Sequence, residues 1–261
     1  MSAKLSPVLA VSAVLLSAGS AAFAATCEKA SPRTTTAVLE LYTSEGCSSC
    51  PPADRWLSGV AAKYAAEGVV SLGFHVDYWD YIGWKDEFGR AAYSKRQHDV
   101  AAANKSRFVY TPQVVLNGRD YRGWSNSAIG RDFAKIKEQP ARADIRIALD
   151  AGDAGLAARV EASVPNPADR AGAALYLALT QNNLVTPVKA GENSGVTLKH
   201  DHVVREWVGP IALNADGKAS LTQSLVLPKG ARLSDLSVAA LVQKPGSGDV
   251  LQALALPACK A

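Results

Sequence analysis

The stretch YTSEGCSSCPPADRWL, residues 42–57, holds two of the four cysteines of the chain, Cys47 and Cys50, with two serines between them and two prolines behind. It follows a run rich in β-forming residues at 34–43 and opens a segment at 51–68 whose apolar residues recur at helical spacing. A cysteine pair between a strand and the start of a helix can be a redox centre, half of a metal site or a structural disulfide. The rest of the sequence is needed to choose among these.

The composition is that of an ordinary globular protein of 261 residues, with 28 Lys and Arg against 24 Asp and Glu. The resulting net charge of +4 is too small to favour nucleic acid or an anionic membrane surface as the main partner. We therefore expect no nucleic-acid function.

The first 24 residues have the pattern of a cleaved secretory signal peptide. Lys4 precedes an apolar run at 7–18, and the small-residue ending Ala22-Phe23-Ala24 marks a cleavage site. The apolar run is too short for a permanent membrane helix. We expect cleavage after Ala24, no membrane insertion of the mature chain, and a periplasmic or secreted location.

The cysteines are informative because an exported protein folds in an oxidising compartment, where cysteines pair. Four cysteines allow three connectivities. The economical one joins Cys47 to Cys50, which are close in sequence, and joins Cys27 to Cys259, since the two ends of a domain often lie near each other. We therefore expect Cys27–Cys259 to be a structural disulfide that ties the end of the chain to its start.

The first half of the chain alternates between strand-forming and helix-forming segments. In order, they are a strand at 34–43, a helix at 51–68, an apolar strand at 69–76, a helical segment at 84–105, a hairpin at 111–124 that turns at Asn117-Gly118, and a helix that ends near Gln139. A strand, a helix and a strand at this spacing predict a right-handed parallel crossover.

Beyond Pro140 the pattern changes to short alternating runs separated by Gly, Pro, Asn and Asp. These runs are ADIRIALD, LAARVEASV, ALYLALTQ, HVVREWVG, ASLTQSLVLP, LSVAALVQK and VLQALALP. Such spacing without helical periodicity predicts an antiparallel β-sandwich. We therefore predict an α/β domain at 25–140, followed by a β-sandwich-like domain at 141–261.

Three motifs in the first half, GCSSCPPAD, FHVDYWDYIGW and YTPQVVLNG, together give a family resemblance. The chain resembles the thioredoxin superfamily, and more narrowly a family of secreted bacterial thioredoxin-like proteins of unassigned function. The resemblance covers roughly residues 34–139 and makes the segment at about 78–106 a helical insertion. It implies a cis peptide bond before Pro112, with Thr111 and Pro112 facing the cysteines and binding substrate.

The resemblance implies a thiol–disulfide oxidoreductase that acts on protein thiols and needs a redox partner but no bound cofactor. The dipole of the helix that starts behind the motif stabilises a thiolate at its front. We expect Cys47, the residue nearer solvent, to attack, and Cys50 to resolve the mixed disulfide. Glu45 opposes the dipole because a nearby anion raises a thiol pKa, so reductase, oxidase and isomerase activities all stay open.

Two other functions compete with this one. The first is a non-catalytic binding or assembly module whose cysteine pair only stabilises the fold. The second is a Cu(I) carrier, in which His75 at the end of the second strand joins Cys47 and Cys50 as a ligand.

Other polar residues receive structural interpretations. The resemblance places the buried acid of thioredoxins at Leu41, so we expect Glu40 to pair with a nearby cation instead. His200 and His202 are expected at a solvated strand start, on one face of the strand. The aromatic residues of DYWDYIGW are expected mainly to pack, with one or two exposed.

Overall fold

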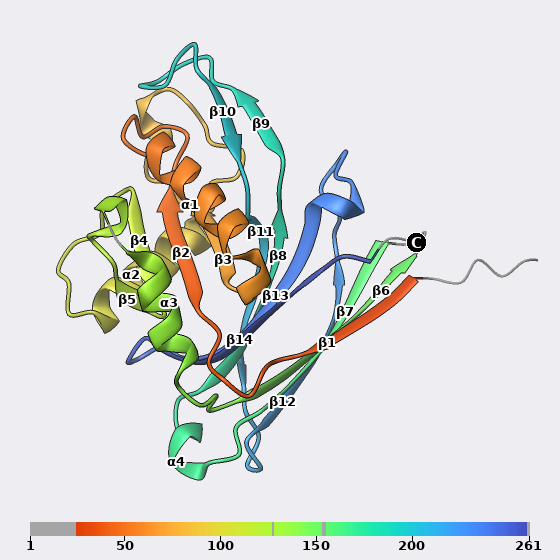
Figure 1. Cartoon of the computed structure of the whole chain (residues 1–261). Helices are drawn as coiled ribbons and strands as arrows, with labels where there is room; N and C mark the ends of the chain where they lie inside the picture. Colours follow the sequence, from red (N-terminus) through yellow and green to blue (C-terminus); the bar gives the residue numbers. More distant parts are fainter. Residues whose placement is uncertain (1–24, 127, 153–154, 260–261) are drawn as a thin grey trace, which may run out of the picture.

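The computed structural model describes residues 25–126, 128–152 and 155–259. The expected signal peptide, residues 1–24, lies outside them. The structure is mixed α/β, with three sheets and few helices (Figure 1). None of the helices in the described ranges has the length and apolar character needed to cross a membrane.

The first half of the chain builds four adjacent strands with helices on both faces. β2 pairs in parallel with β3 and antiparallel with β4, which pairs with β5. The strands are β2 (Val38–Thr43), β3 (Val70–His75), β4 (Gln113–Leu116) and β5 (Arg119–Asp120). The helices are α1 (Pro51–Lys63), α2 (Ala91–Ala103), α3 (Ile129–Lys137) and the short η1 (Ala65–Glu67), η2 (Asp80–Ile82) and η3 (Trp124–Asn126). The expected parallel crossover is therefore present.

Both faces of β2 are buried, which explains its near-continuous apolar sequence. Leu39 and Leu41 pack with Leu57 of α1 and Phe133 of α3 on one face. On the other face the core includes Tyr93 and Val100 of α2, together with residues of the second half of the chain. Figure 1 shows α1 and α3 in front of β2.

The second half is mainly antiparallel strands. They are β6 (Asp144–Gly152), β7 (Gly155–Ser163), β8 (Ala174–Gln181), β9 (Leu184–Pro187), β10 (Thr197–His200), β11 (Val203–Ala212), β12 (Lys218–Leu225), β13 (Leu236–Lys244) and β14 (Asp249–Pro257), with α4 (Pro167–Arg170) and η4 (Leu233–Asp235) between some of them. A four-stranded sheet, β1-β6-β7-β12, in which β1 is Ala25–Ala30, shares one apolar core with β8, β13 and β14. Two sheets facing across a core form a sandwich-like arrangement.

The two halves of the chain share one sheet. Its strand order is β14-β13-β8-β11-β3-β2-β4-β5, and the joint is the pairing of Val203 in β11 with Gly73 in β3. The strand β1 (Ala25–Ala30), from the range expected to form the first domain, pairs antiparallel with β6 of the second half. The two predicted parts are thus continuous at the level of hydrogen-bonded strands.

A disulfide joins Cys27 in β1 to Cys259 just beyond β14, with the two Cα atoms 5.9 Å apart. A second disulfide joins Cys47 to Cys50. Both pairs are those expected from the sequence. The first ties the edge strand of the small sheet to the end of β14.

Glu40 and Arg96 form a buried ion pair between β2 and α2. Arg96 Nε and Nη2 donate to the two carboxylate oxygens of Glu40, each at 2.9 Å. The guanidinium also lies over the Trp207 ring of β11, 4.3 Å from its centroid. Tyr42 donates to Glu40 from the same strand. The expectation that Glu40 pairs with a cation is confirmed.

This ion pair gives a stability prediction. Arg96→Met leaves the Glu40 carboxylate buried without its cation, which should lower the free energy of unfolding by about 3–5 kcal/mol. The measurement is denaturant unfolding. Lys95→Met on the same helix is the matched control, because the Lys95–Asp99 pair is exposed and should contribute less than about 1 kcal/mol. Equal losses in the two variants would contradict a special role of the buried pair.

Candidate functional site

The cysteine motif forms the turn that leads into α1. Cys50 is the residue before the helix, and its carbonyl accepts hydrogen bonds from the amides of Ala53 and Asp54. Cys50 N donates to Cys47 O at 3.1 Å, which closes a tight turn around the disulfide. The two Cα atoms are 5.4 Å apart. The motif is therefore at the front of a helix, as the prolines behind it predict.

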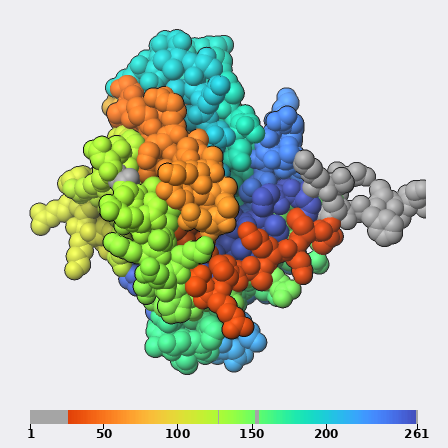
Figure 2. All heavy atoms as spheres, in the orientation of Figure 1, coloured from red at the N-terminus to blue at the C-terminus, as the bar shows by residue number. Residues whose placement is uncertain are grey.

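The expected exposure of Cys47 is wrong. Both cysteines are fully buried at 0% relative exposure, while Ser48 and Ser49 between them are exposed. The cause is the hairpin formed by β9 and β10, whose connecting segment, residues 188–196, lies against the motif. Figure 2 shows the atoms of this hairpin stacked directly against those of the motif region. We call residues 188–196 the hairpin tip.

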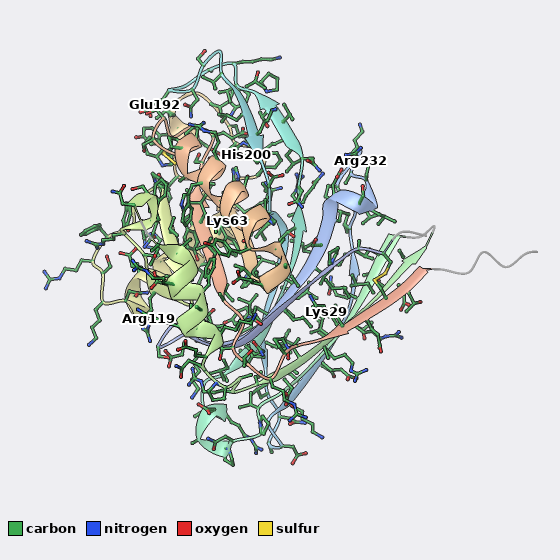
Figure 3. The ribbon with its side chains drawn as sticks, in the orientation of Figure 1. Lys29, Lys63, Arg119, Glu192, His200 and Arg232 are labelled. Atoms are coloured by element: carbon green, nitrogen blue, oxygen red, sulfur yellow. A yellow bond between two sulfur atoms is a disulfide. The ribbon has the colours of Figure 1, made fainter. Side chains whose placement is uncertain are left out.

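Three residues of the hairpin tip hold it on the motif. The buried Asn193 donates from Nδ2 to Glu45 O at 2.8 Å and to Cys47 O at 3.0 Å. Glu192 accepts a hydrogen bond from Ser48 N at 3.0 Å. Gly191, at φ 73°, leaves no spare room, because a Cβ there would lie 3.2 Å from Trp84 Cβ. Figure 3 places Glu192 at this tip, above His200 on the strand below.

Thr111 and Pro112 are joined by a cis peptide bond and are half-buried. Trp79 links them to the motif, because its Nε1 donates to Thr111 Oγ1 at 2.7 Å. The same side chain packs on Gly46, where an added Cβ would come within 3.0 Å of Trp79 Cβ. The structure thus brings Thr111 to the neighbourhood of Cys47 through one tryptophan.

A buried cluster of acids and histidines lies under the motif. His75 Nδ1 is 2.7 Å from Asp86 Oδ2, and His200 Nε2 is 3.2 Å from Glu45 Oε1. The two imidazole rings meet edge to face, with centroids 4.9 Å apart. Trp84 Nε1 donates to the other Glu45 oxygen at 2.8 Å. This cluster ties the cysteine loop, β3 and the hairpin together with charged groups shielded from water.

Asp54 belongs to the same environment. It lies in the first turn of α1 and is buried, and it accepts a hydrogen bond from Thr43 Oγ1 at 3.2 Å. Burial raises the pKa of its carboxyl above the usual value, although the charges of His200 and His75 partly offset that rise. A carboxyl with a raised pKa next to a cysteine motif is suited to exchanging a proton.

His75 and Asp86 perturb each other. Burial alone would lower the pKa of His75, but the charge and hydrogen bond of Asp86, with Asp54 and Glu45 nearby, raise it overall. Burial likewise opposes the charge on Asp86, but His75 and the amides of Glu45 and Phe88 bring the pKa of Asp86 down to about 2. The pair is therefore an ion pair over a defined pH window.

The sequence interpretation missed the position of the histidines. His200 was expected at a solvated strand start but is buried, and its Nδ1 has no hydrogen-bond partner among the described residues. His202 does not share its strand face, because the chain turns there at φ 58°. The alternation of β10, in which Leu198 and His200 are the buried positions, is the signal that could have placed His200 inward.

The aromatic motif mostly packs, as expected. Trp79 and Trp84 bond to Thr111 and Glu45, while Tyr81 is exposed. For the metal alternative, His75 bonds to Asp86 through Nδ1. Over the described ranges, no group of three or more His, Cys, Asp or Glu side chains is arranged to hold a metal ion.

The comparisons with known proteins place the chain in a family. Residues 38–243 match the profile of a family described as a protein of unknown function (DUF1223). The chain belongs to the DUF1223 family. No curated protein sequence matches this DUF1223 protein.

Two solved structures resemble this DUF1223 protein. One is the X-ray crystal structure of protein AGR_C_4864 from Agrobacterium tumefaciens, with a TM-score of 0.60 and 26% identity over 88% of this chain and 97% of that one. The other is HBP35 of Porphyromonas gingivalis, with a TM-score of 0.65 and 19% identity over 88% of this chain and 77% of that one. At that identity, the second likeness concerns the fold alone.

The His75–Asp86 pair predicts a pH-dependent contribution to stability. Because the pKa of His75 is higher in the folded protein than its value of about 6.5 in the unfolded chain, the protonated ring stabilises the fold. This contribution is fully present below about pH 6.5 and is lost as the pH rises through the pKa of His75 in the folded protein. The lowered pKa of Asp86 stabilises above about pH 4, and this contribution is lost as pH falls toward 2. Asp86→Asn should therefore cost about 2 kcal/mol between pH 4 and 6.5, and less outside that window.

The measurement is denaturant unfolding at several pH values, together with NMR titration of the imidazole resonances. In Asp86→Asn the pKa of His75 should fall, because the opposing effect of burial then lacks its main counterweight. His98, exposed on α2, is the internal control whose ring resonances should not respond to the substitution. A pH-independent loss of stability would contradict the ion pair.

Proposed function

We propose that this DUF1223 protein is a periplasmic or secreted thiol–disulfide exchange protein whose redox centre is the Cys47–Cys50 pair. The observation that carries the proposal is the position of the disulfide at the front of α1. The element order β2-α1-β3-α2-β4-β5-α3, with a cis bond before Pro112, supports a thioredoxin-like fold for this half of the chain.

The helix supplies the electrostatics. Unpaired amides at the front of an α-helix carry roughly half a positive charge, which stabilises an anion placed there. Cys47 precedes the helix by one turn of chain, and its Sγ lies 3.3 Å from Ser49 Oγ, a hydroxyl that can donate to a thiolate. A thiolate at Cys47 is therefore a good leaving group and a good nucleophile.

The exchange proceeds in two balanced steps. A substrate thiolate attacks Cys47 Sγ, a substrate–Cys47 disulfide forms, and the Cys47–Cys50 bond breaks with its electron pair on Cys50. A second substrate thiolate then attacks the substrate sulfur of that mixed disulfide and releases Cys47. The substrate dithiol is oxidised and the motif reduced, and the reverse sequence reduces a substrate disulfide. A second thiol–disulfide protein, the redox partner, restores the starting state.

Two further groups have roles in this scheme. The Cys50 thiolate takes up a proton when it leaves, and Asp54, one helical turn further along α1, has a raised pKa suited to supplying that proton. Thr111 and Pro112, which Trp79 links to the motif, are proposed to bind substrate, with the Thr111 backbone pairing with an extended substrate segment as an added strand. No bound cofactor takes part.

The burial of both sulfurs favours a second candidate, a non-catalytic module in which the disulfide stabilises the loop that supports the hairpin. In this case the pair would exchange no more readily than Cys27–Cys259. The two candidate functions therefore differ in how readily Cys47–Cys50 is reduced compared with Cys27–Cys259.

The test compares the two disulfides by differential alkylation and mass mapping across a series of redox buffers. If the proposal holds, Cys47–Cys50 opens under milder conditions than Cys27–Cys259, and Cys50→Ser accumulates mixed disulfides through Cys47 in cells. Cys259→Ser is the matched control, since Cys27 is not at the front of a helix and should trap no specific substrates. If the two disulfides resist reduction equally and Cys50→Ser accumulates no mixed disulfides, the proposal fails and the non-catalytic module is the better interpretation.

A further inference from the structure

Glu192 occupies a position that a thiolate at Cys47 would otherwise use. The amide of Ser48 directly follows Cys47 and precedes the first turn of α1, so it is among the donors available to an anion at the motif. In the structure this amide donates to a Glu192 carboxylate oxygen at 3.0 Å. That bond, reinforced by the Ser48 side chain, lowers the pKa of Glu192, so the carboxylate is held as an anion.

A fixed carboxylate at this point has two effects on Cys47. It takes a hydrogen bond that would stabilise a thiolate, and its negative charge disfavours a second anion nearby, which raises a thiol pKa. Asn193 adds a third effect, because its two hydrogen bonds to Glu45 O and Cys47 O close the hairpin tip over the sulfur. The hairpin tip thus keeps a substrate thiolate from reaching Cys47 and also disfavours the thiolate form of Cys47, and thiol–disulfide exchange needs both.

The hairpin is separate from the two larger sheets in its strand pairing, although His200 of β10 is buried against Glu45. β9 and β10 pair only with each other among the sheets of the described residues. Its two legs join the eight-stranded sheet at Asn183 and His202, which are non-glycine residues in the left-handed region, at φ 59° and 58°. At that joint Asp201 accepts from Asn183 N and Asn182 accepts from His202 N, while Asn183 Nδ2 also donates to Asp235 and His202 O accepts from Gly73 N. Backbone rotation at these two positions would lift the hairpin tip without unpairing the large sheet.

We propose that the β9–β10 hairpin is an autoinhibitory cover of the cysteine motif, with Glu192 as a carboxylate that stands in for the Cys47 thiolate. The inference rests on the proposed function, since a cover matters only if the disulfide underneath exchanges. Opening about Asn183 and His202 exposes Cys47 and returns the Ser48 amide to it. The exposed Ser48 and Ser49 mark where the site is reached.

The test measures how fast a phosphine reduces the Cys47–Cys50 bond in the full-length oxidised protein. The phosphine attacks one sulfur and is hydrolysed to its oxide, leaving two thiols, so the rate reports access without any protein substrate. Asn193→Ala removes two hydrogen bonds of the cover and should speed reduction about tenfold. Ser194→Ala is the matched control in the same tip, because it removes a hydroxyl that donates to Lys189 O within the tip and should leave the rate unchanged.

Glu192→Gln distinguishes the effect of the negative charge of Glu192 from the effect of the hairpin tip covering Cys47. The glutamine oxygen can still accept from Ser48 N, but the negative charge is gone, so the pKa of the Cys47 thiol in the reduced protein should fall, as followed by thiolate absorbance. Because Glu192 is exposed, this variant should fold even if Asn193→Ala does not. A second readout on the folded Asn193→Ala protein is faster hydrogen exchange of the Ser48 amide.

The outcomes are distinguishable. Reduction rates in Asn193→Ala and Glu192→Gln equal to that of the unchanged protein, with an unchanged thiol pKa, overturn the autoinhibitory cover. Faster reduction in Asn193→Ala and a lower thiol pKa in Glu192→Gln support it. If these effects occur but no variant exchanges with protein thiols, the cover stands and the proposed function fails.

Discussion

The pairing of β11 with β3 at Val203 and Gly73 is the constraint on which the other features depend. It merges the strands of both halves into one sheet and sets the start of β11 beside the end of β3. The chain turns at His202, just before this joint, and the ring of His200 at the end of β10 meets the ring of His75 at the end of β3. The hairpin that leads into β11 therefore has to pass over the cysteine loop that follows β2. The cover, the buried cluster and the burial of Cys47 all derive from this one joint.

Charged groups are buried in two places, and they are paired differently in each. On the face of β2 covered by α2, Glu40 and Arg96 form a bidentate ion pair, and three aromatic rings surround the guanidinium. A pair of this kind is a fixed structural element, because both carboxylate oxygens bond to the guanidinium, Arg96 also donates to Gln243, and Glu40 also accepts from Tyr42. Under the motif, by contrast, Glu45, Asp54, Asp86 and two histidines share their charges across three elements. Within it the pKa of Asp54 is raised by burial and the pKa of Asp86 is lowered by His75, and opposed shifts of this kind beside a cysteine motif mark a candidate working site.

Much of the fold follows from local sequence pattern. The strands β2, β3 and β4, the helix α1 and the seven alternating runs of the second half lie where apolar periodicity and turn residues predict them, because these signals are local. The Cys27–Cys259 disulfide could be predicted from the number of cysteines and from the oxidising compartment that the signal-peptide pattern indicates. The sequence did not indicate that Asn193 would bond to Cys47 O, since the two are 146 positions apart and nothing in either segment fixes the register of β11 against β3. The same lack of register information hid the contact of His200 with Glu45 and made Cys47 look exposed.

The disulfide between Cys27 and Cys259 has a consequence for how the molecule is made. Its partners are 232 positions apart, whereas Cys47 and Cys50 are separated by 3. In the proposed periplasmic or secreted setting, the short loop can oxidise as soon as it emerges, while the long one has to wait for nearly the whole polypeptide. In that setting, early closure of Cys47 with Cys50 removes the two sulfurs nearest in sequence with which Cys27 could wrongly pair.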